Sequence, residues 1–321
     1  MTVAVEVVRS GLVESVHEAS VVVLDSASGP AHVWGNAGVV AFARSALKPL
    51  QATAMVRAGL HLRGAELAVG CSSHDATEAH IAVISGILAG TGIDAGSLQC
   101  PPALPGADDA RDRYVQGGGR ADALHHECSG KHSAMLATCV ANDWPLGSYL
   151  APDHPLQAAI RDCVEDLTGD RILATGIDGC GAPTHAVGLT GLARAFSRLA
   201  SADPDSADGC AAAAMRAHPV LVGGVGRDVT EAMRTTPGLV VKDGAEGIYA
   251  LALPDGRAAA FKIHDGGLRA APPLVRAILA FWGVDTEAPA AWGRPPVLGR
   301  GAPVGTIRLR GDTLPPADTV S

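Results

Sequence analysis

The first forty residues show runs of β-branched side chains separated by turn-forming residues, a pattern typical of antiparallel strands. Residues 3–8 form one such run and residues 20–24 another, and β-branched side chains pack well on the pleated surface of a sheet. The sequence Ser-Ala-Ser-Gly-Pro at residues 26–30 favours a turn. The N-terminal segment is therefore predicted to belong to a sheet.

Further along the chain, apolar residues recur at the spacing of amphipathic helices, and two shorter stretches break that pattern. A short apolar run at residues 67–69 predicts a buried strand, and residues 101–119, rich in Pro, Gly and Asp, predict a long loop. Helices are predicted over residues 42–60, 76–88, 130–142, 156–167, 185–199 and 268–282. Strands joined by tight turns are predicted over residues 239–241, 248–253 and 258–263.

The distribution of these elements predicts the fold class. Strands gather towards both ends and helices in the middle, which is not the regular alternation of a doubly wound fold. The pattern favours an α/β protein of the α+β kind, with a mixed, largely antiparallel sheet flanked by helices. We expect one domain over residues 1–321, with a helical subdomain around residues 76–235.

Composition and charge exclude several kinds of partner. The 321 residues carry a net charge of −8, and 47% are apolar. A chain without a basic excess is poorly suited to displace the counterions of nucleic acid, so no nucleic-acid partner is expected. The longest apolar run, around residues 81–93, is too short to span a bilayer, and residues 1–10 do not have the pattern of a signal peptide. We therefore expect no membrane partner and a cytoplasmic location.

Lysine is rare in this chain, which makes each lysine a candidate for chemistry. It occurs only at Lys48, Lys131, Lys242 and Lys262, whereas the other 21 of the 25 basic residues are Arg. A guanidinium stays protonated in proteins, while a buried lysine amine can become neutral and act as a base or a ligand. Lysines are therefore expected to persist where arginine cannot replace them.

The segment Ser45-Ala-Leu-Lys48 has the S-x-x-K spacing of a base-activated nucleophile. Three residues apart near a helix start, the two side chains share one face. A neutral Lys48 could then take the proton of the Ser45 hydroxyl, and its neutrality would require burial or a second cation nearby. The same spacing also fits a helix start that carries a solvated lysine.

Two other segments carry related groups. Cys71-Ser-Ser-His-Asp75 follows the predicted strand at 67–69, which would place Ser73 and His74 at the rim of the sheet; a polar turn that caps the next helix is the alternative. Lys242-Asp-Gly lies between two predicted strands and has the K-x-G form that stands opposite the S-x-x-K pair in serine β-lactamases. An ordinary hairpin turn is the alternative there.

The cysteines suggest a metal site. Seven cysteines without an export signal argue against a disulfide framework. Cys128 and Lys131 lie on one side of a predicted helical turn, and Cys180 stands between two glycines. Two thiolates and one nitrogen could hold Zn²⁺ with an open fourth position, since a metal can displace the amine proton. The alternative is a pair of cysteines buried in the core.

Taken together and in this order, the motifs resemble the L-asparaginase II family of the rhizobial type. The resemblance covers about residues 5–276 and rests on S-x-x-K, C-S-S-H, C-S-G-K-H, D-G-C-G-A-P-T, G-G-V-G-R-D, K-D-G-A-E-G and F-K-I-H-D-G. It implies a fold similar to that of serine β-lactamases and glutaminases. It also implies hydrolysis of L-asparagine to L-aspartate and ammonia. We further expect a homodimer.

The resemblance further implies roles for single residues. It pairs Ser45 with Lys48 and Ser73 with Lys242 as the catalytic groups, with Ser45 as nucleophile. It implies a zinc site made by Cys128, Lys131 and Cys180, and substrate-binding roles for His74, Asp178 and Arg227. The segment Ser73-His-Asp-Ala76 departs from the family, which tends to have a small residue followed by an acid there.

Two other functions stay open at this stage. A different serine acyl-transfer enzyme, acting on glutamine or recognising β-lactams, would keep Ser45, Lys48 and Lys242 but would not need Cys128 and Cys180. A non-catalytic protein that binds zinc or an amino acid would keep both cysteines and tolerate Ser45→Ala.

Overall fold

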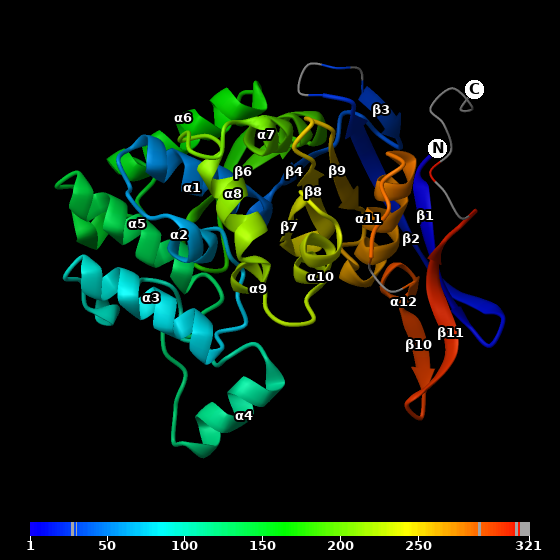
Figure 1. Cartoon of the computed structure of the whole chain (residues 1–321), viewed down its shortest axis with the longest axis horizontal. Coiled ribbons are helices and arrows are strands. Elements are labelled where there is room, and N and C mark those ends of the chain that lie inside the picture. The colour runs from blue at the N-terminus through cyan, green and yellow to red at the C-terminus, as the bar shows by residue number, and fades with distance from the viewer. Residues whose placement is uncertain (27–28, 30, 288–289, 312–313, 315–321) are drawn as a thin grey trace.

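The computed structural model describes residues 1–26, 29, 31–287, 290–311 and 314, and its largest element is an antiparallel sheet. The strands lie in the order β10-β11-β1-β2-β9-β8-β7, with β3 paired to β2, so the two ends of the chain build one sheet (Figure 1). Every strand pair in it is antiparallel. The strands are β1 (Val3–Arg9), β2 (Leu12–Leu24), β3 (Ala31–Trp34), β7 (Val240–Gly244), β8 (Ile248–Ala252), β9 (Ala258–Ile263), β10 (Pro296–Gly299) and β11 (Ala302–Leu309).

Helices cover the sheet and form a layer beside it. Helix α7 packs on β2, β8 and β9, and α11 packs on β11. The bounds are α1 (Lys48–Arg57), α2 (Gly64–Gly70), α3 (Glu78–Gly90), α4 (Asp108–Gln116), α5 (Ser129–Ala141), α6 (Pro155–Thr168), α7 (Leu189–Ser201), α8 (Cys210–Ala217), α9 (Pro219–Val222), α10 (Asp228–Thr235), α11 (Ala271–Phe281) and α12 (Ala290–Gly293). No helix in the described ranges is both long and apolar enough to cross a membrane.

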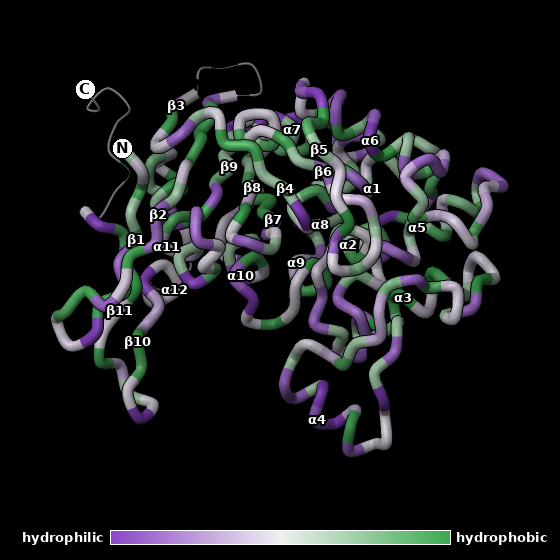
Figure 2. The backbone as a smooth tube through the Cα atoms, turned by 180° about the vertical axis from the view of Figure 1, so that it is seen from behind, coloured by the Kyte–Doolittle hydropathy of each residue, from purple (hydrophilic) through white to green (hydrophobic). Residues whose placement is uncertain are grey.

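A second, smaller sheet joins the helical layer to the start of α1. Its strands are β4 (Val40–Phe42), β6 (Pro183–Gly188) and β5 (Ala174–Ile177), in the order β4-β6-β5. The 3-10 helix η1 (Arg44–Leu47) follows β4 and leads directly into α1. Helix α4 stands away from the rest of the helical layer, and Figure 2 shows that its residues are mostly hydrophilic. The predicted α/β fold class, a largely antiparallel sheet flanked by helices, is therefore confirmed.

Several predicted elements are wrong. Residues 67–69 belong to helix α2 and not to a strand, because a short apolar run does not distinguish the two structures. Residues 185–199 divide into the end of β6 and most of α7, and the predicted loop at 101–119 contains helix α4 between its Pro- and Gly-rich ends. Residues 42–60 contain the end of β4, η1 and then α1 rather than one helix.

Other differences concern the strands. Lys242 lies within β7 itself rather than in a hairpin turn, because the turn is formed by residues 245–247. Strand β2 begins eight residues before the predicted run at 20–24. The turn predicted at 26–30 lies partly outside the described residues. Helices α3 to α10 fall within the expected helical subdomain at 76–235, as do β5 and β6; the division into domains stays a prediction.

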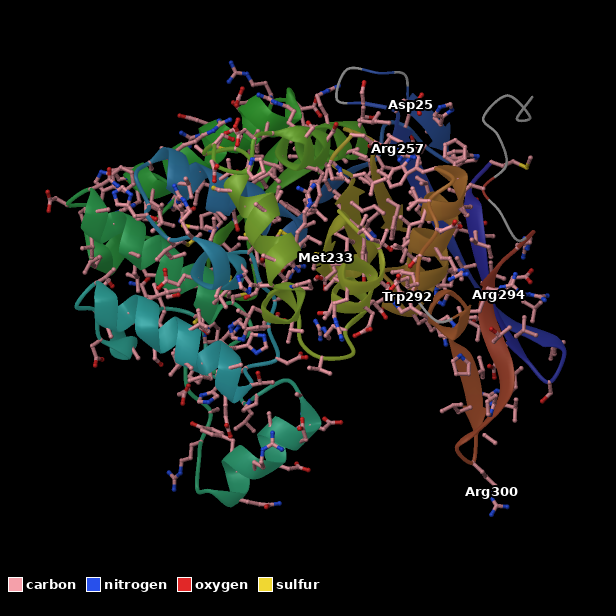
Figure 3. The ribbon with its side chains drawn as sticks, in the orientation of Figure 1. Asp25, Met233, Arg257, Trp292, Arg294 and Arg300 are labelled. Atoms are coloured by element: carbon pink, nitrogen blue, oxygen red, sulfur yellow. The ribbon has the colours of Figure 1, made fainter. Side chains whose placement is uncertain are left out.

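The C-terminal strands carry no motif, yet they complete the large sheet. Strand β11 pairs with β1 in a register that sets Val5 opposite Leu309. A Cβ at Gly305 would lie 1.8 Å from the carbonyl oxygen of Val8, so only glycine allows the two strands to approach this closely. Figure 3 shows Arg300 at the tip of the β10–β11 hairpin, directed away from the molecule.

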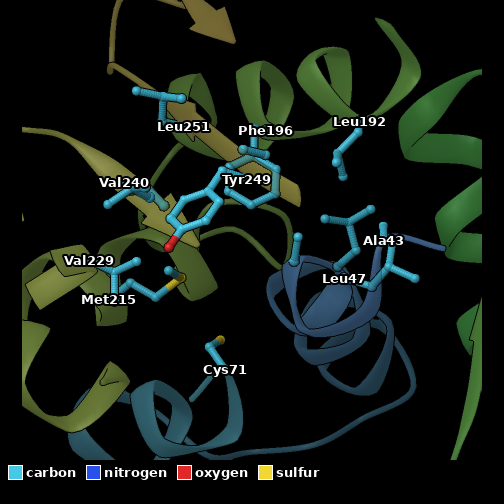
Figure 4. Close-up of a cluster of buried hydrophobic side chains, with 14 of the residues drawn as sticks. Ala43, Leu47, Cys71, Leu192, Phe196, Met215, Val229, Val240, Tyr249 and Leu251 are labelled. Carbon is cyan, nitrogen blue, oxygen red and sulfur yellow. The ribbon is translucent and has the colours of Figure 1, made fainter. Parts of the chain in front are cut away.

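The apolar core lies directly beneath the segments that carry the candidate residues. Figure 4 shows Leu47, Cys71 and Val240 in one cluster with Phe196 and Tyr249, which come from α7 and β8. Each of the first three side chains stands one or two residues before a candidate lysine or serine. Packing of this core therefore fixes the relative positions of η1, the end of α2 and β7.

Candidate active site

Three segments that are distant in sequence bring two lysines onto one serine hydroxyl. The Nζ of Lys48, at the start of α1, lies 3.0 Å from the Oγ of Ser73. The Nζ of Lys242, on β7, lies 3.0 Å from the same oxygen. All three side chains are buried, with exposed fractions of 1%, 4% and 0% in the order Lys48, Ser73, Lys242. The expected contact between Ser73 and Lys242 is thus present, and Lys48 contacts the same serine hydroxyl.

Local sequence explains why Ser73 sits at this point. Helix α2 ends at Gly70, and after a turn at Cys71 the chain continues without regular secondary structure through Ser72 and Ser73. The carbonyl oxygen of Ser72 accepts a hydrogen bond of 2.5 Å from Lys48 Nζ. A Cβ at Gly130 would lie 2.3 Å from the carbonyl oxygen of Val69, so a glycine is needed where the start of α5 packs against the end of α2.

Burial and a neighbouring cation shift Lys242 towards its neutral form. Burial lowers the pKa of Lys242 below its ordinary value, and the positive charge of Lys48 acts in the same direction, while Asp243 opposes them. Lys242 Nζ also forms a short ion pair with the carboxylate of Asp243. Burial alone would raise the pKa of Asp243, but Lys242 and Arg227 outweigh it and the pKa is lowered. Asp243 is therefore a half-buried carboxylate that stabilises a cation beside Ser73.

Ser45 lies next to this group but does not share its hydrogen bonds. It belongs to η1, is half-buried, and its carbonyl oxygen accepts a hydrogen bond from the backbone N–H of Lys48. Within the described part of the chain its hydroxyl has no hydrogen-bond partner, so the expected bond between Ser45 Oγ and Lys48 Nζ does not form in this structure. The reason is that the Lys48 side chain extends towards the end of α2. The role of Ser45 as nucleophile stays a prediction.

A second group of buried side chains lies where the zinc site was predicted. Lys131 Nζ lies 3.0 Å from Cys180 Sγ, and Cys180 and Cys128 lie close enough for each to shift the pKa of the other. The exposed fractions of Cys128, Lys131 and Cys180 are 3%, 1% and 2%. Two of these residues come from the start of α5 and the third from the turn between β5 and β6. The structure therefore brings the three expected ligands together.

The electrostatics of this cluster suit a metal-binding thiolate. Interaction with Cys180 holds the pKa of Cys128 well below its usual range, and the same interaction together with burial raises the pKa of Cys180. Burial would lower the pKa of Lys131, but the two sulfurs outweigh it and the pKa is raised. No group of three or more His, Cys, Asp or Glu side chains in the described ranges is placed to hold a metal. A metal in this cluster would therefore use Lys131 as its nitrogen ligand, a donor set that fits Zn²⁺.

The three expected substrate-binding residues are engaged in different ways. His74 accepts a hydrogen bond at Nδ1 from the Ala76 N–H, 3.1 Å away, so its Nε2 must donate to Ser129 Oγ, 3.0 Å away. Both ring nitrogens are thus used within the protein, which leaves His74 without a free one for a substrate. Asp178 accepts a hydrogen bond of 2.7 Å from Arg44 Nε.

Arg227 contacts two carboxylates and lines two cavities. Its guanidinium lies 3.3 Å from the Asp75 carboxylate and 3.9 Å from the Asp243 carboxylate. One cavity, of about 310 Å³, is lined by His74, Asp75 and Arg227 among others. The second, of about 230 Å³, is lined by Arg227, Asp243 and Tyr249 among others. Arg227 is the only one of the three expected substrate-binding residues that lines both of these cavities.

Sequence reasoning missed two charged residues of the site. Asp243 neutralises Lys242, and its position next to a functional lysine was a signal that could have been used. Arg44 precedes Ser45 and pairs with Asp178, 134 residues away. No local sequence pattern predicts the ion pair between Arg44 and Asp178.

Comparison with known proteins supports the family that the motifs resemble. The family model of L-asparaginase II matches residues 5–309. Among solved structures, this chain is similar to Mglu in its native form in 4.3 M NaCl, with a TM-score of 0.46 and 11% identity over 83% of this chain and 61% of that chain. It thus spans about three fifths of the length of Mglu.

The chain is also similar to a structure described as a putative β-lactamase from Bacteroides dorei DSM 17855, with a TM-score of 0.38 and 15% identity over 83% of this chain and 86% of that chain. No curated protein matches the sequence. The family model, in contrast, spans nearly the whole chain and includes both groups of buried lysines. The protein therefore belongs to the L-asparaginase II family.

Proposed function

We propose that this amidohydrolase cleaves the side-chain amide of L-asparagine, giving L-aspartate and ammonia. The observation that carries the proposal is the buried hydroxyl of Ser73 with one lysine amine on each side at 3.0 Å. Such a group can hold and move a proton without a histidine, as Ser–Lys variants of acyl transfer require. Family membership supports the reaction class, and the substrate is our inference. A homodimer and a cytoplasmic location stay predictions.

In the proposed reaction, Ser45 attacks and Lys48 takes its proton. The bond from Ser45 Oγ to the side-chain carbonyl carbon forms while the carbon–nitrogen bond breaks, and the leaving nitrogen departs as ammonia with a proton from the lysine. Water then hydrolyses the β-aspartyl ester and regenerates Ser45. Ser73 connects Lys48 with Lys242, so that a proton can pass between the two amines.

Exposure supports Ser45 over Ser73 as the nucleophile. Ser73 is 4% exposed and its oxygen is held by two amines, whereas Ser45 is half-buried and free of hydrogen bonds within the described residues. A nucleophile must reach a substrate carbon, and catalytic hydrogen bonds often tighten only when substrate binds. The missing bond between Ser45 and Lys48 is therefore compatible with the role.

Zinc is part of the proposal. Cys128, Lys131 and Cys180 would hold the ion, and Zn²⁺ when bound supplies Lewis-acid polarisation of an amide oxygen or of water. These residues also tie the start of α5 to the turn before β6. The Lewis-acid chemistry and the link between α5 and this turn both depend on Cys128 and Cys180, which are far apart in sequence.

Removal of one thiol is expected to remove most of the zinc. The purified protein should contain close to one zinc per chain, and Cys180→Ala should lose most of it because a thiolate ligand is gone. The measurement is elemental analysis of dialysed protein. Cys163→Ala is the matched control, because Cys163 is a buried thiol on α6 that serves only the core. Equal zinc content in the two variants would contradict the ligand assignment.

The pH dependence should reveal the depressed lysine. Because burial and Lys48 lower the pKa of Lys242, deprotonation of Lys242 begins below the ordinary lysine range. A neutral Lys242 can accept, through Ser73, the proton that Lys48 takes from Ser45, so kcat should rise with pH and level off above an apparent pKa that is lower than that of a free lysine. A profile of initial ammonia release against pH measures this. A rate that falls across the same interval would contradict a lysine base.

The substrate is tested by comparison of three compounds. Ammonia release should be fastest with L-asparagine, slower with L-glutamine, and a chromogenic cephalosporin should remain intact. Faster release from glutamine would make the protein a glutaminase, and cephalosporin cleavage would favour a β-lactam-recognising enzyme. No turnover of any of the three compounds, with zinc bound, would favour a non-catalytic binding protein.

A further inference from the structure

Arg44 has a backbone conformation that an arginine seldom adopts. Its φ angle is +51°, in the left-handed region, and it immediately precedes Ser45. For a residue with a Cβ, this conformation is unfavourable and persists only where the surroundings enforce it. The conformation bends the chain at the first residue of η1, just after β4. The direction in which Ser45 leaves the small sheet therefore depends on whatever holds Arg44.

The side chain of Arg44 is held by a single carboxylate across the site. Its Nε donates to Asp178 Oδ1 at 2.7 Å, and the two side chains are only 28% and 12% exposed. Within the described ranges Arg44 has no other side-chain partner. A partly buried charge pair of this kind is oriented more firmly than an exposed one, because water screens it less.

Asp178 is itself the anchor of the turn that carries Cys180. Its Oδ1 accepts the N–H of Gly179 at 2.8 Å, its N–H donates to the Ala182 carbonyl at 2.9 Å, and its carbonyl accepts from Gly181 at 2.9 Å. Gly181 has a φ of +86°, which suits glycine. These bonds close a tight turn over residues 178–182, which we call the Cys180 turn. Asp178 and Cys180 therefore move together.

The other side of η1 is fixed by close approach to β7. A Cβ at Gly244 would lie 2.5 Å from the carbonyl oxygen of Ala43 and 3.2 Å from the backbone nitrogen of Ala46. Residues 43–46, which we call the Ser45 turn, are thus bounded on one side by the strand that carries Lys242. On the other side they are bounded by the Arg44–Asp178 pair. Removal of the ion pair would leave one of the two constraints.

We infer that Arg44 and Asp178 are positioning residues that lock the Ser45 turn to the Cys180 turn. This inference rests on the proposed function for its catalytic consequence. It reassigns Asp178 from substrate contact to positioning, because its carboxylate is already engaged by Arg44 and Gly179. The pair connects the nucleophile directly with the predicted zinc site.

The test compares four single variants and one double variant of the full-length protein. Arg44→Gly permits the left-handed backbone but removes the ion pair, Asp178→Asn removes the charge from the other side, and Arg44→Lys keeps a cation. Arg57→Ala is the control, because Arg57 forms surface ion pairs with Asp166 and Asp208 away from the site. The double variant combines Arg44→Gly with Asp178→Asn.

Two readouts are measured on each variant. The first is kcat and KM for L-asparagine, and we expect kcat to fall about tenfold to a hundredfold in Arg44→Gly and Asp178→Asn, with KM changed by less than about threefold. The second is the alkylation rate of Cys180 followed by peptide mass spectrometry, with buried Cys163 as internal reference. We expect alkylation of Cys180 to accelerate at least about tenfold in both variants, because the turn opens locally.

Further comparisons decide the outcome. The double variant should be no worse than the more damaged single variant, since both remove one interaction, and Arg44→Lys should recover part of kcat. Unchanged alkylation of Cys180 in Arg44→Gly, or a raised KM with an unchanged kcat, would overturn the inference. If the wild type does not hydrolyse asparagine, the proposed function fails, while the alkylation readout still decides whether the two turns are locked together.

Discussion

The Ser45→Ala variant is expected to lose at least about a thousandfold in kcat with L-asparagine while it remains folded. The loss follows because Ser45 is the proposed nucleophile, and Ser73, whose hydroxyl contacts Lys48, is buried. Stability should hardly change, because the Ser45 hydroxyl has no hydrogen-bond partner among the described residues and its removal leaves no buried group unsatisfied. Ammonia release and the midpoint of thermal unfolding measure the two effects.

Ser201→Ala is a suitable control for this loss. Ser201 is an exposed serine at the end of α7 whose hydroxyl bonds only the Ser197 carbonyl of its own helix, so full activity is expected. Retention of a tenth of wild-type activity by Ser45→Ala would move the nucleophile to another residue. Ser73 would be the next candidate, because both lysines already contact its oxygen.

The second large effect concerns the identity of the base. Lys48→Arg should be nearly as inactive as Lys48→Ala, with kcat reduced on the order of a thousandfold in both. Arginine keeps the positive charge but cannot supply a neutral amine, and its planar head cannot reproduce the contacts of one nitrogen with Ser72 and Ser73. Steady-state ammonia release measures kcat.

Lys262→Arg is the matched control, because Lys262 is the lysine outside both buried groups. Its Nζ donates to the Ile263 carbonyl at 2.5 Å, a contact that needs only a cationic donor. This variant should keep near wild-type activity. A Lys48→Arg enzyme that retains activity would show that Lys48 acts as a fixed charge and that the base lies elsewhere.

Periodicity located the elements that bury one face along their whole length. Helices α3, α5 and α6 lie within two residues of the predicted ranges, since each is long enough for the helical spacing of apolar residues to show. Short elements were predicted wrongly, because they contain too few residues for the spacing of apolar positions to show. Helix α2 has only seven residues and is buried at its C-terminal end, so its apolar run looks like a strand.

Most residues of the candidate site could be predicted from the sequence, but some of their contacts could not. The rarity of lysine pointed to Lys48, Lys131 and Lys242, and these three are buried while Lys262 is only half-buried. Residue type alone carried that signal, because a buried cation has to be paired or functional. Which lysine faces which serine depended on tertiary packing, and the S-x-x-K spacing alone suggested a contact between Ser45 and Lys48 that this structure does not contain.

Arg44 illustrates what local sequence does not encode. Neither its left-handed backbone nor its ion pair with Asp178 follows from the residues beside it. Arginine has no preference for positive φ, and its partner lies 134 residues away. Only the packing of η1 between β7 and the turn after β5 reveals why the chain bends there.

The most direct test of the mechanism is rapid acid quenching of the enzyme during turnover of L-asparagine, followed by peptide mass spectrometry. The account predicts a β-aspartyl ester on the peptide that contains Ser45, because the ester is the intermediate between the two chemical steps. The ester should be absent from the peptide that contains Ser73. An ester on Ser73, or full ammonia release without any ester on the enzyme, would contradict the proposed acyl transfer through Ser45.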